Sequence, residues 1–182
     1  ISASKKQLNR FVKKFSGVST GELLGKKWQA NRFRSPYLRE ALWQQGYVVD
    51  TFETATDWGN VDNLMAKVEA AMRDGLTDEG EKVHVFTHLS HVYSQGCSLY
   101  TTYLYRNADS YQATLARWQK LKHQASEIIV NNGGTISHQH GVGKDHAPYL
   151  AVEKGELGMK VLESLATHFD ADQQLNPGTL LE

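Results

Sequence analysis

A tight hairpin is the feature that most constrains the fold of this chain. Two runs rich in β-branched and aromatic residues, 82–93 and 98–105, are separated by a short turn around Ser94, Gln95 and Gly96. A turn of this length can join antiparallel neighbours, whereas parallel strands need a crossover of a dozen or more residues. The sequence therefore predicts an antiparallel sheet that contains these two strands.

Helical periodicity flanks this hairpin on both sides. Apolar residues recur at three-and-four spacing in several segments, and a proline-started stretch suits one further short helix; the expected helices are 3–15, 36–43, 62–73, 109–130 and 156–169. Further strands are expected at 47–52 and 135–138. Strands flanked by helices, with a hairpin in the middle, favour an α+β fold over a doubly wound parallel sheet.

Composition narrows the class of protein. Of the 182 residues, 40% are apolar, which suits one soluble domain over residues 1–182. Twenty basic and twenty acidic side chains cancel, so the positive field that proteins use to bind a phosphate backbone is absent, and nucleic acid is not expected as a partner.

The single cysteine and the first residue bear on the setting of the chain. Cys97 cannot form an internal disulfide, and the sequence has neither a signal-peptide pattern nor a membrane-length apolar run, so a reducing, cytoplasmic setting fits best. The chain begins at Ile1 without an initiator methionine. We therefore expect it to be a piece of a longer chain.

The densest polar segment is 137–144, which places two imidazoles, an amide, two glycines and a lysine at a predicted strand-to-helix junction. If strand geometry continues through it, His138 and His140 point to the same face. Histidine, with an ordinary pKa of about 6.5, suits acid–base work. Gly141 and Gly143 permit close approach of the backbone to a ligand. The segment thus predicts acid–base or hydrogen-bonding work beside a bound cofactor.

The segment 137–144 has three other interpretations. A phosphate-binding loop is excluded, because His138 stands where the glycine is required and Asp145 follows Lys144 where serine or threonine should stand. A metal site is open to neutral imidazoles, with further candidate ligands at His84, His88 and His91. No recognised ligand spacing is present, so an organic cofactor is preferred and no metal ligand is assigned. The third interpretation is that both residues have no functional role and are surface histidines or hydrogen-bonded core histidines.

The second strand of the hairpin is rich in tyrosine. Alternation puts Tyr103 and Tyr105 on one face and Tyr100 with Thr102 on the other. Aromatic residues in strands ordinarily pack in the core or on the sheet surface.

A third cluster is the segment 34–40, which has Arg34 and Arg39 near the start of the helix expected at 36–43. An arginine there can bind a phosphate or carboxylate through two hydrogen bonds, although a solvated ion pair is the usual outcome.

Short motifs occur along the chain in an order that resembles one family, the alkylglycerone-phosphate synthases and related bacterial FAD-linked oxidases. The resemblance covers most of the chain from Tyr37 onward. The motifs are Tyr37-x-Arg39, Phe52-Glu53-Thr54 with Trp58 four residues on, Tyr93-x-x-Gly96-x-x-Leu99-Tyr100, Gly133-Gly134 before His138-x-His140-Gly141-Val142-Gly143, and Leu175-Asn176-Pro177-Gly178.

This resemblance implies a cofactor and partners. The chain would be the latter part of a partial ferredoxin-like cap domain plus the carboxyl-terminal helices that return to the flavin. The domain that binds the FAD pyrophosphate would lie upstream in the same chain. FAD would be held noncovalently in the full-length enzyme and only weakly by this piece, which alone would be inactive. The synthases exchange an acyl group for an alkyl ether on dihydroxyacetone phosphate, in ether lipid synthesis. A small-molecule substrate, such as a phosphorylated lipid precursor, is expected, and a homodimer is left open.

The resemblance also implies roles for single residues. They are His138, His140 and Tyr100 as catalytic residues, Arg39 and Gln139 as substrate-binding residues, and Gly141, Gly143, Lys144 and Asn176 as cofactor-binding residues.

The sequence departs from the family pattern at a few positions. Gln139 replaces the middle member of a triple-histidine motif, which removes a titratable group. Thr179 stands where a lysine is common, and the His-Gly-Asp-Gly-Asn metal motif of flavin D-2-hydroxyacid dehydrogenases is missing. An FAD-dependent oxidoreductase acting on an unknown hydroxy compound, and a binding module without chemistry, therefore remain as alternatives.

Overall fold

The computed structural model describes residues 1–181 and divides into two compact units, residues 1–41 and the chain from Leu42 onward. The first unit contains α1 (Ser2–Lys14), α2 (Leu23–Asn31), the 3-10 helix η1 (Arg32–Arg34) and most of α3 (Ser35–Gln44). Helix α1 matches the helix predicted at 3–15. None of the residues of α1 or α2 is buried.

The second unit has the element order strand, helix, hairpin, helix, helix. Its members are β1 (Tyr47–Asp57), η2 (Trp58–Asn60), α4 (Val61–Asp74), η3 (Thr77–Glu79), β2 (His84–Val92), β3 (Gly96–Arg106), α5 (Tyr111–Asn131) and α6 (Gly143–Phe169). The strands form an antiparallel sheet in the order β1-β3-β2. The predicted hairpin and the predicted α+β class are confirmed.

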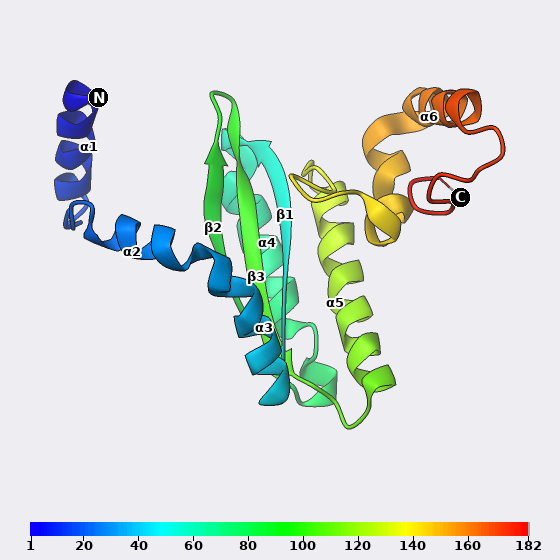
Figure 1. Ribbon diagram of the computed structural model, residues 1–182, viewed down its shortest axis with the longest axis horizontal. Helices are drawn as coiled ribbons and strands as arrows, with labels where there is room; N and C mark the ends of the chain where they lie inside the picture. The colour runs from blue at the N-terminus through cyan, green and yellow to red at the C-terminus, as the bar shows by residue number, and fades with distance from the viewer. Residues whose placement is uncertain (182) are drawn as a thin grey trace. The chain divides into compact units, whose positions relative to one another are not determined.

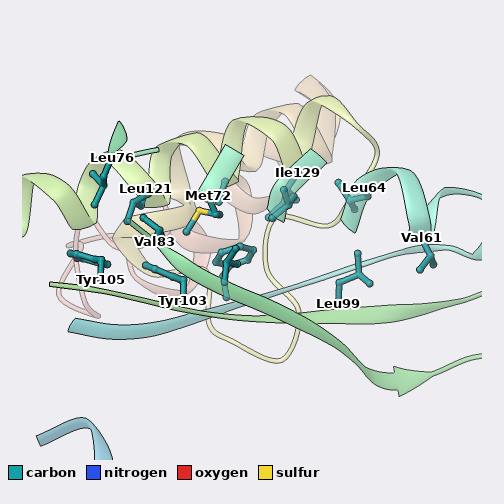
Figure 2. Close-up of a cluster of buried hydrophobic side chains, with 14 of the residues drawn as sticks. Val61, Leu64, Met72, Leu76, Val83, Leu99, Tyr103, Tyr105, Leu121 and Ile129 are labelled. Atoms are coloured by element: carbon teal, nitrogen blue, oxygen red, sulfur yellow. The ribbon is translucent and has the colours of Figure 1, made fainter. Parts of the chain in front are cut away.

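Helices α4 and α5 cover one face of this sheet (Figure 1). Strand alternation sends Tyr103 and Tyr105 to the same face, as the sequence predicts, and this is the helix-covered face, where both are almost fully buried. Figure 2 shows the side chains of α4 and α5, such as Met72 and Leu121, turned toward those of the strands. Each fully buried side chain of this size stabilises the fold by about 1.5–3 kcal/mol. The opposite face of the sheet is called the outer face below.

The segment after α5 takes the place of a fourth strand. In a ferredoxin-like sheet the last strand lies antiparallel to the first. Here the backbone N–H of Thr135 donates to the carbonyl oxygen of Ala55, and that of His138 donates to the carbonyl oxygen of Glu53, both over 3.0 Å. The hydroxyl of Thr54 also donates to the carbonyl oxygen of Thr135 over 2.7 Å. The strand predicted at 135–138 is thus an irregular segment that follows the edge of β1.

Helix α6 begins earlier than the sequence predicts. It starts at Gly143 rather than near residue 156, and Gly155, with φ of 67° and ψ of 171°, divides it into two helical segments. In the first segment His146 and Leu150 are buried. Tyr149 is hydrogen-bonded over 2.6 Å to His123 of α5. Within the described residues, no helix has both the length and the apolar character that a membrane span requires.

Candidate functional site

Strand pairing sets a row of polar residues across the outer face. Glu53 of β1 lies opposite Tyr100 of β3, and Tyr100 lies opposite His88 of β2. Directly paired residues of antiparallel strands project to the same face. Because Phe52 and Thr54, the neighbours of Glu53, are buried on the helix side, this row lies on the outer face.

Glu53 is the centre of a cluster formed with His91 and His138, here called the Glu53 cluster. Its Oε1 atom lies 3.2 Å from Nδ1 of His91 and 3.3 Å from Nδ1 of His138. The side chain of Glu53 is only 3% exposed, whereas those of His91 and His138 are 41% and 17% exposed. The cluster therefore has a buried carboxylate and two imidazoles closer to solvent.

The surroundings of Glu53 favour its ionised form. Burial by itself raises the pKa of Glu53, but hydrogen bonds with Ser98 and His91 and the electrostatic attraction of His138 outweigh burial. The pKa of Glu53 therefore lies below its ordinary value. Ser98 also accepts the backbone N–H of His91 over 2.9 Å, which fixes β2 beside the cluster.

Tyr93, at the end of the hairpin, extends the Glu53 cluster toward solvent. Its hydroxyl is hydrogen-bonded over 3.0 Å to Nε2 of His138. The indole N–H of Trp58 donates to the carbonyl oxygen of Tyr93 over 3.2 Å, and the backbone N–H of Trp58 donates to that of Gln95 over 3.1 Å. The hairpin tip is thus held against the end of β1, which positions Tyr93 beside His138.

Tyr100 and His140 meet next to this cluster. Their ring centroids are 6.0 Å apart, with the rings edge to face. Tyr100 also contacts the ring of His88, with the two ring centroids 5.2 Å apart. The Tyr100 hydroxyl donates to the hydroxyl of Thr51 over 3.2 Å. Tyr100 is half-buried, so it is accessible from the outer face.

The two histidines of the 137–144 segment do not reach the outer face by strand alternation. Gln139 has φ of 59°, so the extended backbone ends there. The hydroxyl of Ser137 donates to the carbonyl oxygen of His140 over 2.6 Å and closes a turn. Even so, His138 contacts Glu53 and His140 contacts Tyr100, and these two contacted residues are direct cross-strand partners. The structure thus brings His138, His140 and Tyr100 together.

The other predicted site residues are more dispersed. Gln139, Gly141 and Lys144 are exposed around the start of α6, and Gly143 is its first residue. Asn176 is exposed in the loop after α6, with φ of 55°. Arg39 lies on α3 in the first unit. The substrate and cofactor roles of these residues stay predictions.

Sequence reasoning assigned no role to Glu53 or Tyr93 beyond motif membership. A glutamate between the core residues Phe52 and Thr54 is a usable signal, because alternation then places it on the opposite face of a strand. Its burial there depends on the loop carrying His138, which local sequence does not reveal.

The sheet, its two covering helices and the polar outer face define an α+β domain of partial ferredoxin-like type. The chain belongs to the family "FAD linked oxidases, C-terminal domain", whose family model matches residues 4–180.

The chain is also similar in sequence and in fold to individual proteins. The chain is 27% identical over 167 residues to an alkyldihydroxyacetonephosphate synthase of Trypanosoma brucei brucei, covering 92% of this chain and 27% of the relative. It is also 27% identical to the enzyme of the same name from Dictyostelium discoideum, covering 93% and 28%. A solved alkyldihydroxyacetonephosphate synthase structure matches with a TM-score of 0.66 and 20% identity, over 97% of this chain and 29% of that one. The chain therefore shares their fold and spans under a third of their length.

Proposed function

We propose that this chain is the substrate-side domain of an FAD-dependent enzyme that resembles alkylglycerone-phosphate synthase, also called alkyldihydroxyacetonephosphate synthase. The observation that supports it most is the meeting of Tyr100 with His140, beside His138, on one face of the sheet. Convergence of separate segments is typical of a site. In the relatives of that name, this part corresponds to less than a third of the chain, so the flavin-binding domain would be supplied by the same polypeptide upstream.

The start of α6 fits an approach to the flavin. Gly141 is exposed and faces open space, with nothing within 4 Å of where a Cβ would stand, so its backbone can come close to a ligand. Gly141, Gly143 and Lys144 would hold the cofactor together with Asn176. When bound, FAD would supply the electrophilic and redox-active ring system.

Tyr100 and His140 would handle a substrate proton. The Tyr100 hydroxyl is held by Thr51 over 3.2 Å, and His140 meets the tyrosine ring at its edge. A substrate above this pair could exchange a proton with either side chain. His138 would contribute to the same surface, oriented by Tyr93 over 3.0 Å. Arg39 and Gln139 would bind the substrate, Arg39 by pairing with its anionic group.

A direct assay tests this function. The flavoenzyme that carries this chain should incorporate a labelled long-chain alcohol into acyl-dihydroxyacetone phosphate and release the fatty acid. Tyr100→Phe and His140→Ala should reduce this incorporation while FAD stays bound. Wild-type rates in both variants would refute the assignment of the site.

A second candidate function has its own supporting observation. Gln139 is exposed in the turn between the two histidines and provides an amide where the synthase-like motif has an imidazole. An FAD-dependent oxidation of a hydroxy compound fits this change. Bleaching of the flavin by hydroxy acids or alcohols without air, together with no alkyl incorporation, would favour this second candidate.

A cytoplasmic location is proposed for either of the two candidate functions, because Cys97 is buried and unpaired.

A further inference from the structure

We infer that the Glu53 cluster is a binding site for a divalent transition-metal ion, with Zn²⁺ as the ion of best fit. The ligands would be Oε1 of Glu53 and Nδ1 of both His91 and His138. The sequence leaves a metal site open to His91 and to the histidines of segment 137–144, but it has no recognised ligand spacing, because these three residues come from separate segments. The inference shares His138 with the proposed function but does not rest on it, since it concerns an ion bound by these three side chains and can be tested without the flavin.

The spacing of the ligand atoms carries the first step. A tetrahedral zinc ion with bonds of about 2.0 Å holds its ligand atoms roughly 3.3 Å apart. In the Glu53 cluster the carboxylate oxygen lies 3.2 Å from one imidazole nitrogen and 3.3 Å from the other. All three ligand atoms lie within 4.8 Å of one another. An ion can therefore bind with only small side-chain movements.

The second step is a buried nitrogen without an aligned partner. Nδ1 of His138 is inaccessible to solvent and makes no hydrogen bond within residues 1–181, although the carboxylate of Glu53 is 3.3 Å away. Buried polar atoms are nearly always hydrogen-bonded, so an exception calls for an explanation such as an ion. A metal bond would use the lone pair of this nitrogen.

The third step is the support around the ligands. Metal-binding histidines usually donate their other ring N–H to an oxygen, which fixes the tautomer. Nε2 of His138 meets the hydroxyl of Tyr93 over 3.0 Å, so it can donate in this way. The hydroxyl of Ser98 accepts the backbone N–H of His91 over 2.9 Å, which holds the second histidine in place.

Charge and ligand type select the ion. One carboxylate and two neutral imidazoles present a single negative charge to a dication. Nitrogen-containing sets suit zinc and similar ions, whereas Mg²⁺ and Ca²⁺ prefer oxygen ligands. Three protein ligands leave a position for water or substrate, as in catalytic rather than structural zinc sites. The 41% exposure of His91 is consistent with such an open position.

Metal titration of the purified protein tests the inference without flavin. Metal-free protein should bind one equivalent of Zn²⁺ by calorimetry, and Co²⁺ should give visible ligand-field absorption that Zn²⁺ abolishes. Glu53→Gln, His91→Ala and His138→Ala should each lower zinc affinity by more than the roughly 10–100-fold that an outer-shell change costs. Tyr93→Phe should fall within that smaller range.

His84→Ala is the matched control, because His84 lies on the same strand as His91 and outside the Glu53 cluster. It should leave affinity unchanged. Zinc should also raise the melting temperature of wild type and of His84→Ala, but not that of His138→Ala. His138 is a loop residue, so this variant should fold. Absence of binding, or unchanged zinc affinity in His138→Ala, would overturn the site and leave the flavin proposal untouched.

Discussion

Thr135 donates its backbone N–H to the carbonyl oxygen of Ala55 over 3.0 Å, and its side-chain oxygen accepts the backbone N–H of Ala55 over the same distance. This reciprocal pair attaches the loop after α5 to the free edge of β1. The pairing continues to His138, whose backbone N–H donates to the carbonyl oxygen of Glu53, and ends there because the backbone turns at Gln139. The sheet edge thus positions the loop and leaves the imidazoles available for ligands.

Thr135→Val should weaken this attachment. Valine has nearly the same shape but cannot accept the N–H of Ala55, and a net hydrogen bond of this kind contributes about 1 kcal/mol. We expect the free energy of unfolding in urea to fall by about that amount. Thr167→Val, at an exposed position of α6, is the matched control and should change it little. Equal stability of both variants would contradict the role of Thr135.

Gly134→Ala should destabilise the fold by overpacking. A Cβ at Gly134 would stand 2.6 Å from Oγ1 of Thr54 and 3.0 Å from side-chain carbons of Ile129 and Leu64. Such overpacking typically costs about 1–3 kcal/mol, measurable by urea denaturation. Gly141→Ala is the control, because nothing lies within 4 Å of a Cβ there. A loss in Gly141→Ala as large as that in Gly134→Ala would contradict this account.

Much of the fold could be predicted from local pattern. Alternation in residues 98–105 correctly places Tyr103 and Tyr105 on one face of the strand, and both are buried because helices cover that face of β3. The start of α6 could not be predicted, since Gly143 and Pro148 are unfavourable in helices. The first part of α6 forms although the helix propensity of its residues is low, and its side chain Leu150 is buried.

The site was predictable only in part, for a related reason. The histidine pair and Tyr100 stand out by residue type and motif, and the structure brings them together. The contact between Glu53 and His138 depends on an edge pairing between segments about eighty residues apart. Residue spacing carries no information on such a contact, so the Glu53 cluster emerged only from the structure.

Glu81 should make stability depend on acid pH. Burial raises its pKa, but hydrogen bonds from Arg106, over 2.9 and 3.2 Å, and from the backbone of Lys82 outweigh burial and lower it. A lowered folded-state pKa gives stability above the ordinary value of 4.5 that is lost as pH falls below it. Glu81→Gln should therefore be less stable at pH 7 and show a shallower loss on acidification in urea titrations. An unchanged acid slope would count against this linkage.

Cys97 should resist thiol reagents in the native state. Its side chain is fully buried, and burial raises the pKa of the thiol, so little thiolate is available to react. We expect a chromogenic disulfide reagent to label the protein slowly in buffer and completely in denaturant. Stoichiometric labelling of native protein within the mixing time would show that this part of β3 is accessible.

Substitutions of the predicted site residues should change different kinetic constants, kcat or KM, of the flavoenzyme that carries this chain. Loss of a positioned acid–base group typically costs about 10²–10⁴-fold in rate, so Tyr100→Phe and His140→Ala should depress kcat at saturating substrate. Arg39→Ala should instead raise KM with kcat nearly unchanged, because an anion anchor acts chiefly on substrate binding. Flavin absorbance should stay at wild-type levels in all three variants, which distinguishes these effects from cofactor loss. His168→Ala, at an exposed position of α6, is the matched control for His140→Ala and should keep wild-type kinetics. If Arg39→Ala lowered kcat as strongly as Tyr100→Phe did, the division between proton transfer and anion binding would have to be abandoned.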